Sequence, residues 1–194
     1  MRTLLSYHKK CHARLAQLAV DRRGLSAIEF ALILPIILVL MAAAEDFGQA
    51  LMVERKMSQI AATASDMAAQ QATWTTKNLD AILSGTGTII QPFPNGTLTI
   101  VVSALNVDSL LNTSVAWSRA YNTSAWPVGS TPPFSVSKTI LQSGVQIVIA
   151  KATYNITTPF ASLLRPITGT STYSYTRYGL NRPRVSDTIT LSGS

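Results

Sequence analysis

Cysteine and histidine are nearly absent from this chain of 194 residues. The single cysteine, Cys11, and the two histidines, His8 and His12, all lie within the first 24 residues. Residues 25–194 therefore contain no disulfide, no thiol nucleophile, no zinc site built from Cys and His, and no histidine-based triad. The sequence disfavours a secreted enzyme, and we expect a protein without catalytic activity, metal or other cofactor.

Charged side chains are also scarce, at 13% of the chain, and they are unevenly distributed. Of the net charge of +7, residues 1–24 contribute +5 and the rest only +2. No segment after residue 24 has enough Lys and Arg to neutralise many phosphates, so nucleic acid is not an expected partner. Positive charge before an apolar segment keeps that side in the cytoplasm. The N-terminus is predicted to be cytoplasmic, and the C-terminal part periplasmic or extracellular.

The longest apolar run covers residues 25–44, LSAIEFALILPIILVLMAAA, and Glu29 is its one charge. At about 1.5 Å per residue, a helix of this length crosses a hydrocarbon core of roughly 30 Å. We therefore expect a transmembrane helix in a lipid bilayer. Pro35 removes one backbone hydrogen bond from this helix, which predicts a kink. An acidic residue at the centre of such a helix costs about 2.5–3.5 kcal/mol, so Glu29 is predicted to have a partner.

The N-terminal region has three possible interpretations. An uncleaved signal anchor accounts for the length and the flanking charge, but it leaves Glu29 unexplained. A secretory signal peptide would be cut after Ala42-Ala43-Ala44, but its basic region is long and its apolar region starts with a carboxylate. A prepilin would be cut between Gly24 and Leu25 on the cytoplasmic side, which leaves the apolar helix attached.

The prepilin interpretation is favoured because it alone uses the basic flank, the glycine and the acidic residue together. The run from Arg22 to Ala68 resembles the TadE-like pseudopilins of the tight adherence (Tad) pilus, and Asn181–Arg184 (NRPR) resembles the end of such proteins. In that family a membrane aspartic prepilin peptidase cuts after the glycine of a G-x-x-x-x-E-[FY] motif. The resemblance implies that Arg22, Arg23, Gly24, Leu25, Glu29 and Phe30 form the processing and assembly motif.

Cleavage would create a positive charge close to Glu29. The new ammonium group on Leu25 would lie one helical turn before the carboxylate. Two unit charges about 4 Å apart attract by roughly 4 kcal/mol at an effective dielectric constant of ~20, which is comparable with the cost of the buried charge. We expect Glu29 to pair with the amine of its own or a neighbouring subunit. The alternative is a carboxylate that reaches the cytoplasmic interface.

Residues 45–73 are predicted to extend the helix beyond the apolar run, to about Ala72. The family's E-F-G-R cluster is altered here to Glu45–Gln49 (EDFGQ), with an inserted Asp and a Gln in place of Arg. Further along, apolar residues recur in steps of three and four and form one helical stripe. The stripe comprises Val53, Met57, Ile60, Ala64 and Met67. It could pack on the chain's own domain or against another pilin helix, and the first is favoured.

Residues 74–194 are predicted to form an exported domain. A short helix is expected to be capped by Asn78 and stopped by Gly85. Alternating apolar residues or β-branched runs predict strands in the ranges 97–104, 115–121, 145–156 and 170–178. We expect an antiparallel sheet of three to five strands packed on the long helix. The predicted fold class is therefore α+β: a long N-terminal helix on a small sheet, as in pilins.

These features and the resemblance predict a minor pseudopilin of Tad-type pilus assembly. Residues 1–24 would be a cleaved leader, 25–44 a membrane helix, 45–73 its extension and 74–194 the exported domain. The implied partners are a prepilin peptidase, the major pilin, other minor pseudopilins, the inner-membrane assembly platform and the lipid bilayer. The expected location is the inner membrane, with a single pass, or the pilus. The alternative is a membrane-anchored periplasmic binding or scaffold protein without a pilus role.

Overall fold

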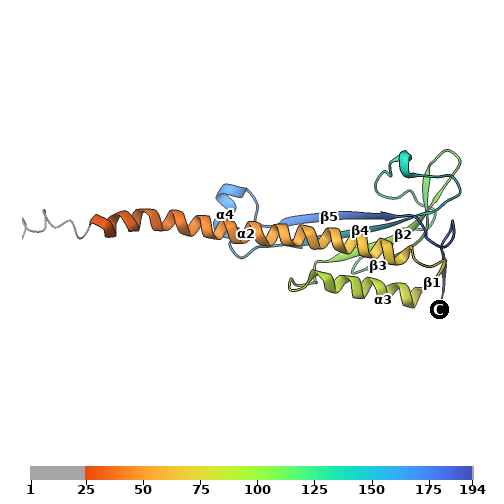
Figure 1. Cartoon of the computed structure of the whole chain (residues 1–194), viewed down its shortest axis with the longest axis horizontal. Coiled ribbons are helices and arrows are strands. Elements are labelled where there is room, and N and C mark those ends of the chain that lie inside the picture. The colour runs from red at the N-terminus through yellow and green to blue at the C-terminus, as the bar shows by residue number, and fades with distance from the viewer. Residues whose placement is uncertain (1–24, 194) are drawn as a thin grey trace, which may run out of the picture. The chain divides into compact units, whose positions relative to one another are not determined.

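The structure, a computed structural model, describes residues 25–193. The chain divides into two compact units, Met1–Glu45 and Asp46–Ser194. The predicted leader, with Arg22, Arg23 and Gly24, lies outside the described residues. Figure 1 labels the helices and strands of the described part. The long apolar helix and the antiparallel sheet that follows it confirm the predicted α+β fold.

The long helix, α2, runs from Leu25 to Ala68 and is followed by the first short strand. It ends four residues before the predicted Ala72, where other segments bind the carbonyl groups of its last residue and of the residue that follows. The Trp74 Nε1–H donates to the Ala68 carbonyl at 2.9 Å. The Arg184 N–H donates to the Ala69 carbonyl at 3.0 Å. Carbonyl groups at a helix end need such partners when the chain turns away, and here residues distant in sequence supply them.

The second unit contains a four-stranded antiparallel sheet in the order β3-β2-β4-β5. Its strands are β2 (Thr99–Val107), β3 (Thr113–Tyr121), β4 (Ile147–Ile156) and β5 (Tyr173–Asn181). A second, parallel sheet pairs β1 (Thr73–Thr75) with β6 (Thr190–Ser192). The helices outside α2 are α3 (Thr76–Gly87) and α4 (Ala161–Thr168), with 3-10 turns at Thr88–Ile90 and Lys138–Ile140.

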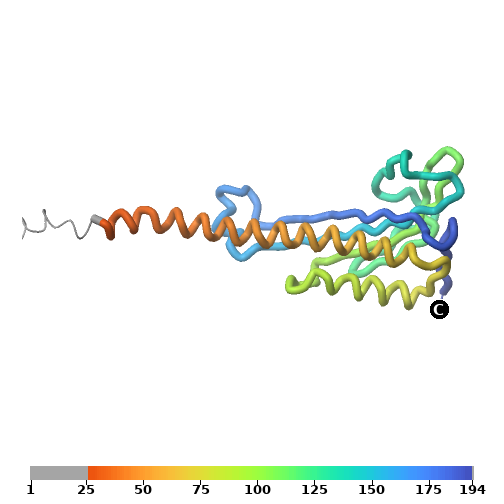
Figure 2. The backbone as a smooth tube through the Cα atoms, in the orientation of Figure 1, coloured from red at the N-terminus to blue at the C-terminus, as the bar shows by residue number. Residues whose placement is uncertain are grey.

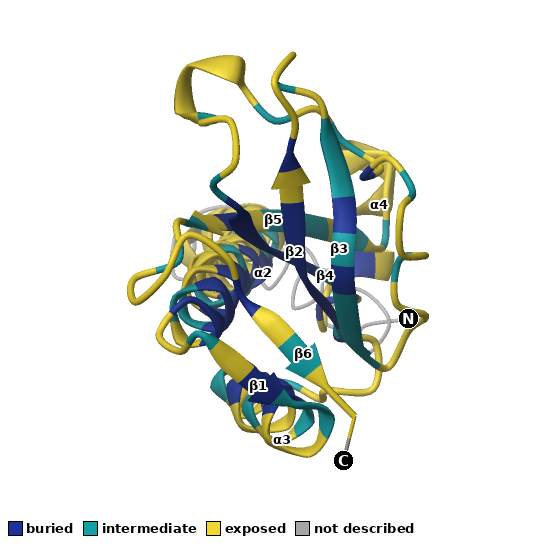
Figure 3. Ribbon diagram, turned by 90° about the vertical axis from the view of Figure 1, so that its right-hand side faces the viewer, coloured by how far each residue is buried: buried dark blue, intermediate teal, exposed yellow. Residues whose placement is uncertain are grey.

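The predicted stripe on α2 belongs to the chain's own core. Its first four members are fully buried among residues of the sheet, including Ile100 and Val148. Figure 3 shows this buried face of α2 turned toward the strands. Met67 was wrongly assigned to the stripe, because it is 36% exposed and the fully buried Ala68 takes its place. The helix thus packs on its own sheet, as the sequence favoured.

The two central strands, β2 and β4, are buried on both faces, which the alternating pattern of residues 97–104 did not predict. A second cluster, on the face away from α2, is formed by Leu105, Val115, Ile147 and Ile149. Aromatic and apolar residues of the segment between β3 and β4, Trp126 and Phe134 among them, cover this cluster. The covering segment excludes water from positions that would otherwise face solvent.

A β-bulge changes the predicted grouping on β3. Trp117 pairs with Ala104, but the next pair joins Val115 with Leu105, so the register shifts between them. Val115 and Trp117 were expected on one face, yet they belong to different core clusters. A bulge inserts one extra residue and so re-aims the side chains beyond it.

The short helix α3 starts earlier than predicted. Its N-cap is Thr75, whose side-chain oxygen accepts the N–H of Asn78 at 3.2 Å, so Asn78 is not the cap. The helix also passes Gly85 and ends at Gly87. A bidentate ion pair, with Arg119 Nε 2.9 Å from Asp80 Oδ1, joins α3 to β3.

Strand β5 follows the C-terminal half of α2 in the same direction, as Figure 2 shows. Arg177 forms an ion pair with Glu54, and Asn181 Nδ2 donates to the Ser65 hydroxyl at 2.8 Å. Between these contacts, the backbone of Gly179 lies directly against α2. A Cβ atom at this position would lie 2.1 Å from the Ala61 carbonyl oxygen. The close packing of strand and helix therefore requires glycine.

Candidate functional site

The predicted processing motif lies at the start of α2. The helix begins at Leu25, so Glu29 follows it by one helical turn. Glu29 and Phe30 are both exposed, Phe30 to 61%. The cleavage glycine lies outside the described residues, so cleavage and the pairing of Glu29 with a new amine stay predictions.

The apolar run exposes large side chains all around α2. Those from Ile28 to Met41 include Phe30, Leu32, Ile36, Leu38 and Leu40. α2 is also, within residues 25–193, the one helix that is long and apolar enough to cross a membrane. Exposed apolar surface of this extent is unfavourable in water, so it indicates contact with lipid or with other apolar helices. Pro35 lies inside the helix without ending it, and the predicted kink stays a prediction.

Asp46 is a structural anchor that the sequence did not reveal. Its side chain is on α2, at the start of the second unit, and the residue is only 2% exposed. Its carboxylate accepts the Thr158 hydroxyl at 2.6 Å and the Phe160 N–H at 3.0 Å. The inserted Asp of the EDFGQ cluster thus fastens the segment after β4 to α2. The sequence signal was an acidic residue directly after an apolar run, but its partners are more than 100 residues away.

Replacing Asp46 by Asn should destabilise the second unit by about 1–3 kcal/mol. An amide has one acceptor oxygen instead of two, so either Thr158 or Phe160 loses its buried acceptor. Thermal unfolding of the full chain in detergent, followed by circular dichroism, measures this loss. The same change at the exposed Asp187 is the control and should alter stability by less than about 0.5 kcal/mol. Equal stability of both variants would contradict the anchoring role.

The NRPR motif at Asn181–Arg184 binds the end of α2. Asn181 contacts Ser65, Arg184 forms an ion pair with Asp66, and the Arg184 N–H caps the Ala69 carbonyl. A cation close to the C-terminus of a helix also interacts favourably with the helix dipole. In this chain the motif therefore stabilises the packing of the end of β5 against the end of α2.

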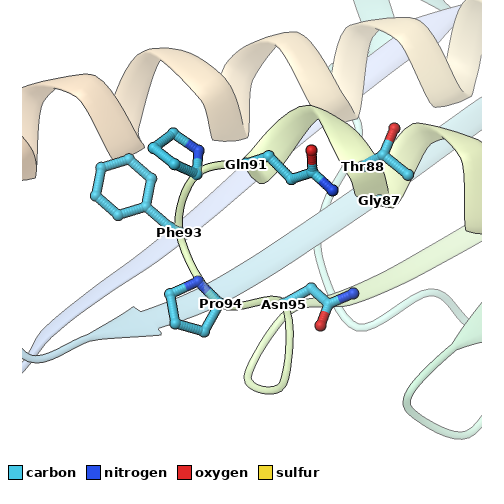
Figure 4. Close-up of a pocket in the computed structure, with 7 residues that line it drawn as sticks. Gly87, Thr88, Gln91, Phe93, Pro94 and Asn95 are labelled. Atoms are coloured by element: carbon cyan, nitrogen blue, oxygen red, sulfur yellow. The ribbon is translucent and has the colours of Figure 1, made fainter.

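A shallow hollow in the second unit lies beside the loop after α3. Figure 4 shows it, with Gly87, Thr88 and residues 91–95 as its lining. The Tyr154 hydroxyl donates to the Pro94 carbonyl at 2.8 Å and so fixes this loop to β4. None of the lining residues is ionisable. Among residues 25–193, no group of three His, Cys, Asp or Glu side chains could hold a metal ion.

Comparison with known proteins gives a family match. The model of the family described as TadE-like protein matches residues 24–66. Neither the curated proteins nor the solved structures give a match. The matched segment begins at the predicted cleavage glycine and includes Glu29, Phe30, the apolar run and most of the core stripe. The family prediction made from the sequence is confirmed: residues 24–66 form a TadE-like segment, which indicates a role related to the Tad pilus.

Proposed function

We propose that this chain is a minor pseudopilin of a Tad-type pilus. A prepilin peptidase cuts it between Gly24 and Leu25, and the mature chain is then incorporated into the pilus or primes its assembly. The observation that carries this proposal is the TadE-like segment, which begins at Gly24. The start of α2 at Leu25 supports it, because the new N-terminus would be the first residue of the apolar helix.

The two units of the chain suit two different tasks. The large apolar side chains from Ile28 to Met41 on α2 are exposed. They therefore require lipid before assembly and other pilin helices afterwards. The second unit has its own hydrophobic core, made from α2 and the sheet. It can therefore be presented outside the membrane while the apolar helix changes its surroundings.

Glu29 gives the apolar helix a means of recognising other subunits. A carboxylate in an apolar environment is costly, and the Leu25 ammonium created by cleavage offers the opposite charge. When such a pair forms between neighbours, it favours a helix packing in which both charges are neutralised. The partners proposed for these steps are the peptidase, the major pilin, sister pseudopilins and the inner-membrane assembly platform.

The N-terminal residue of the mature protein tests the proposal. We expect Leu25 at the N-terminus when the chain is isolated from cells with an active prepilin peptidase, and the intact leader when that peptidase is deleted. N-terminal sequencing and intact mass spectrometry distinguish the outcomes. An N-terminus at Met1 in both strains would identify an uncleaved membrane-anchored protein, and one at Glu45 a secreted domain. Either result overturns the pseudopilin assignment.

A further inference from the structure

The connection between β4 and β5 carries a small helix with two different faces. Ala161 and Leu164 of α4 are buried, at 1% and 4% exposure. On the other side of this segment, Phe160, Leu163 and Ile167 are exposed to 41%, 57% and 75%. The exposed apolar side chains have no task in the core of the second unit. Their exposure to water is unfavourable, so this face calls for an apolar environment.

Hydrogen bonds fix this connection at the level of Asp46. The Asp46 carboxylate binds both Thr158 and the N–H of Phe160, which is the N-cap residue of α4. In the sequence, Asp46 follows the end of the apolar run at Ala44 by two residues. When residues 25–44 span a bilayer, Asp46 lies at the membrane–water interface. Because the Phe160 N–H binds Asp46, the start of α4 is held close to the residue that marks this interface.

The charge of this connection fits a phospholipid surface. Residues 157–172 contain no Asp or Glu, and their one charged side chain is the exposed Arg165. Phe47, one residue after the anchoring aspartate, is also exposed, to 66%. Apolar side chains together with a basic residue are typical of helices that lie in the headgroup region of anionic membranes.

We propose that α4 is a second membrane contact of this protein, with Phe160, Leu163 and Ile167 inserted into the bilayer surface and Arg165 among the phosphate headgroups. The inference rests on the proposed membrane anchoring of residues 25–44. This contact strengthens the membrane binding that the apolar helix provides. It must be broken when the subunit leaves the bilayer. Asp46 is then the residue that keeps α4 at the correct depth.

Single spin labels test this contact in the full-length chain. The chain has one cysteine, so Cys11→Ser gives a cysteine-free background into which Leu163→Cys or Ile167→Cys is introduced. Both side chains are exposed, so labelling does not disturb the core. The labelled protein is placed in vesicles of phosphatidylethanolamine and phosphatidylglycerol. Power-saturation electron paramagnetic resonance then compares the accessibility of each label to oxygen, which concentrates in lipid, and to a water-soluble nickel chelate.

Two labelled variants serve as matched references. Ile37→Cys lies in the apolar run, and Leu110→Cys lies in the loop between β2 and β3, where the residue is 72% exposed. We expect the ratio of oxygen to nickel accessibility at positions 163 and 167 to exceed that at position 110 by about threefold or more. Removing phosphatidylglycerol should lower this ratio at position 163. In the Arg165→Gln variant, the ratio at position 163 should be the same with and without phosphatidylglycerol.

The alternative outcomes separate this inference from the proposed function. Water-like values at positions 163 and 167, with a lipid-like value at position 37, overturn the contact by α4 and leave the anchor intact. A water-like value at position 37 contradicts the membrane anchor itself, and the inference with it. Exclusion of both reagents at positions 163 and 167 would show burial against protein, which also overturns a lipid contact.

Discussion

Replacing Glu29 by Gln is expected to reduce incorporation of the chain into pili at least about tenfold, while the cut after Gly24 proceeds. Glutamine has nearly the same size as glutamate but cannot neutralise the Leu25 ammonium. The charge pair is worth roughly 4 kcal/mol at an effective dielectric constant of ~20, and a loss of even 1.4 kcal/mol is about tenfold in an equilibrium. The mature protein should therefore accumulate in the membrane.

Two measurements on the same cells separate processing from assembly. Intact mass spectrometry of the membrane fraction reports cleavage, and immunoblotting of sheared pili reports incorporation. Asp187→Asn is the control, because it removes one negative charge at an exposed position of the second unit and should leave both readouts near the wild-type level. Normal piliation by the Glu29→Gln variant would refute the charge pair, and a loss of cleavage would place Glu29 in peptidase recognition instead.

Replacing Gly179 by Ala is expected to destabilise the second unit by at least about 3 kcal/mol, the upper part of the range for overpacked cores. The added Cβ would lie 2.1 Å from the Ala61 carbonyl oxygen and 2.5 Å from the Ser65 hydroxyl oxygen. The oxygen of Ala61 belongs to the backbone of α2 and cannot rotate away. Strand and helix must therefore separate, which weakens the core formed by Val53, Met57 and Ile60.

Gly85→Ala provides the control for this change, because it adds the same methyl group in α3, where it meets no atom within 4 Å apart from its chain neighbours and the nearby backbone of its own helix. Alanine favours helix more than glycine, so this variant should be as stable as wild type or more stable by up to about 1 kcal/mol. Chemical or thermal unfolding of the full chain in detergent measures both variants. Equal stability of Gly179→Ala and the control would contradict the close contact between β5 and α2.

Patterns within single segments predicted the long helix, the short helix after it and the four strands of the main sheet, but not α4 or the pair of β1 and β6. The apolar run and the stripe that begins at Val53 predicted one long helix, and the structure has α2 from Leu25 to Ala68. The β-branched run before Ile156 predicted β4, one of the two central strands with partners on both sides. Periodicity succeeds here because the spacing of apolar residues along a segment matches the repeat with which a helix or a strand directs side chains to one face.

The candidate processing site was readable from a short motif, since Gly24, Leu25 and Glu29 are close in sequence. The TadE-like match over residues 24–66 confirms the family of this segment. The roles proposed for Gly24 and Leu25 come from the resemblance to TadE-like pseudopilins, and the role proposed for Glu29 also uses its spacing of one helical turn from Leu25, so no tertiary contact was needed to propose them. Their test is biochemical, through cleavage and assembly.

Several features were decided by tertiary structure alone. Asp46 is buried because Thr158 and Phe160 fold back onto it, and Gly179 is required because β5 packs closely on Ala61. The central strands β2 and β4 are buried on both faces because the segment after β3 covers their second side. The sequence by itself determined a long apolar helix with one acidic residue, followed by a β-rich domain. Tertiary packing decided which distant residues contact each other. Local periodicity indicates whether a side chain is buried, but it carries no information about the segment that buries it.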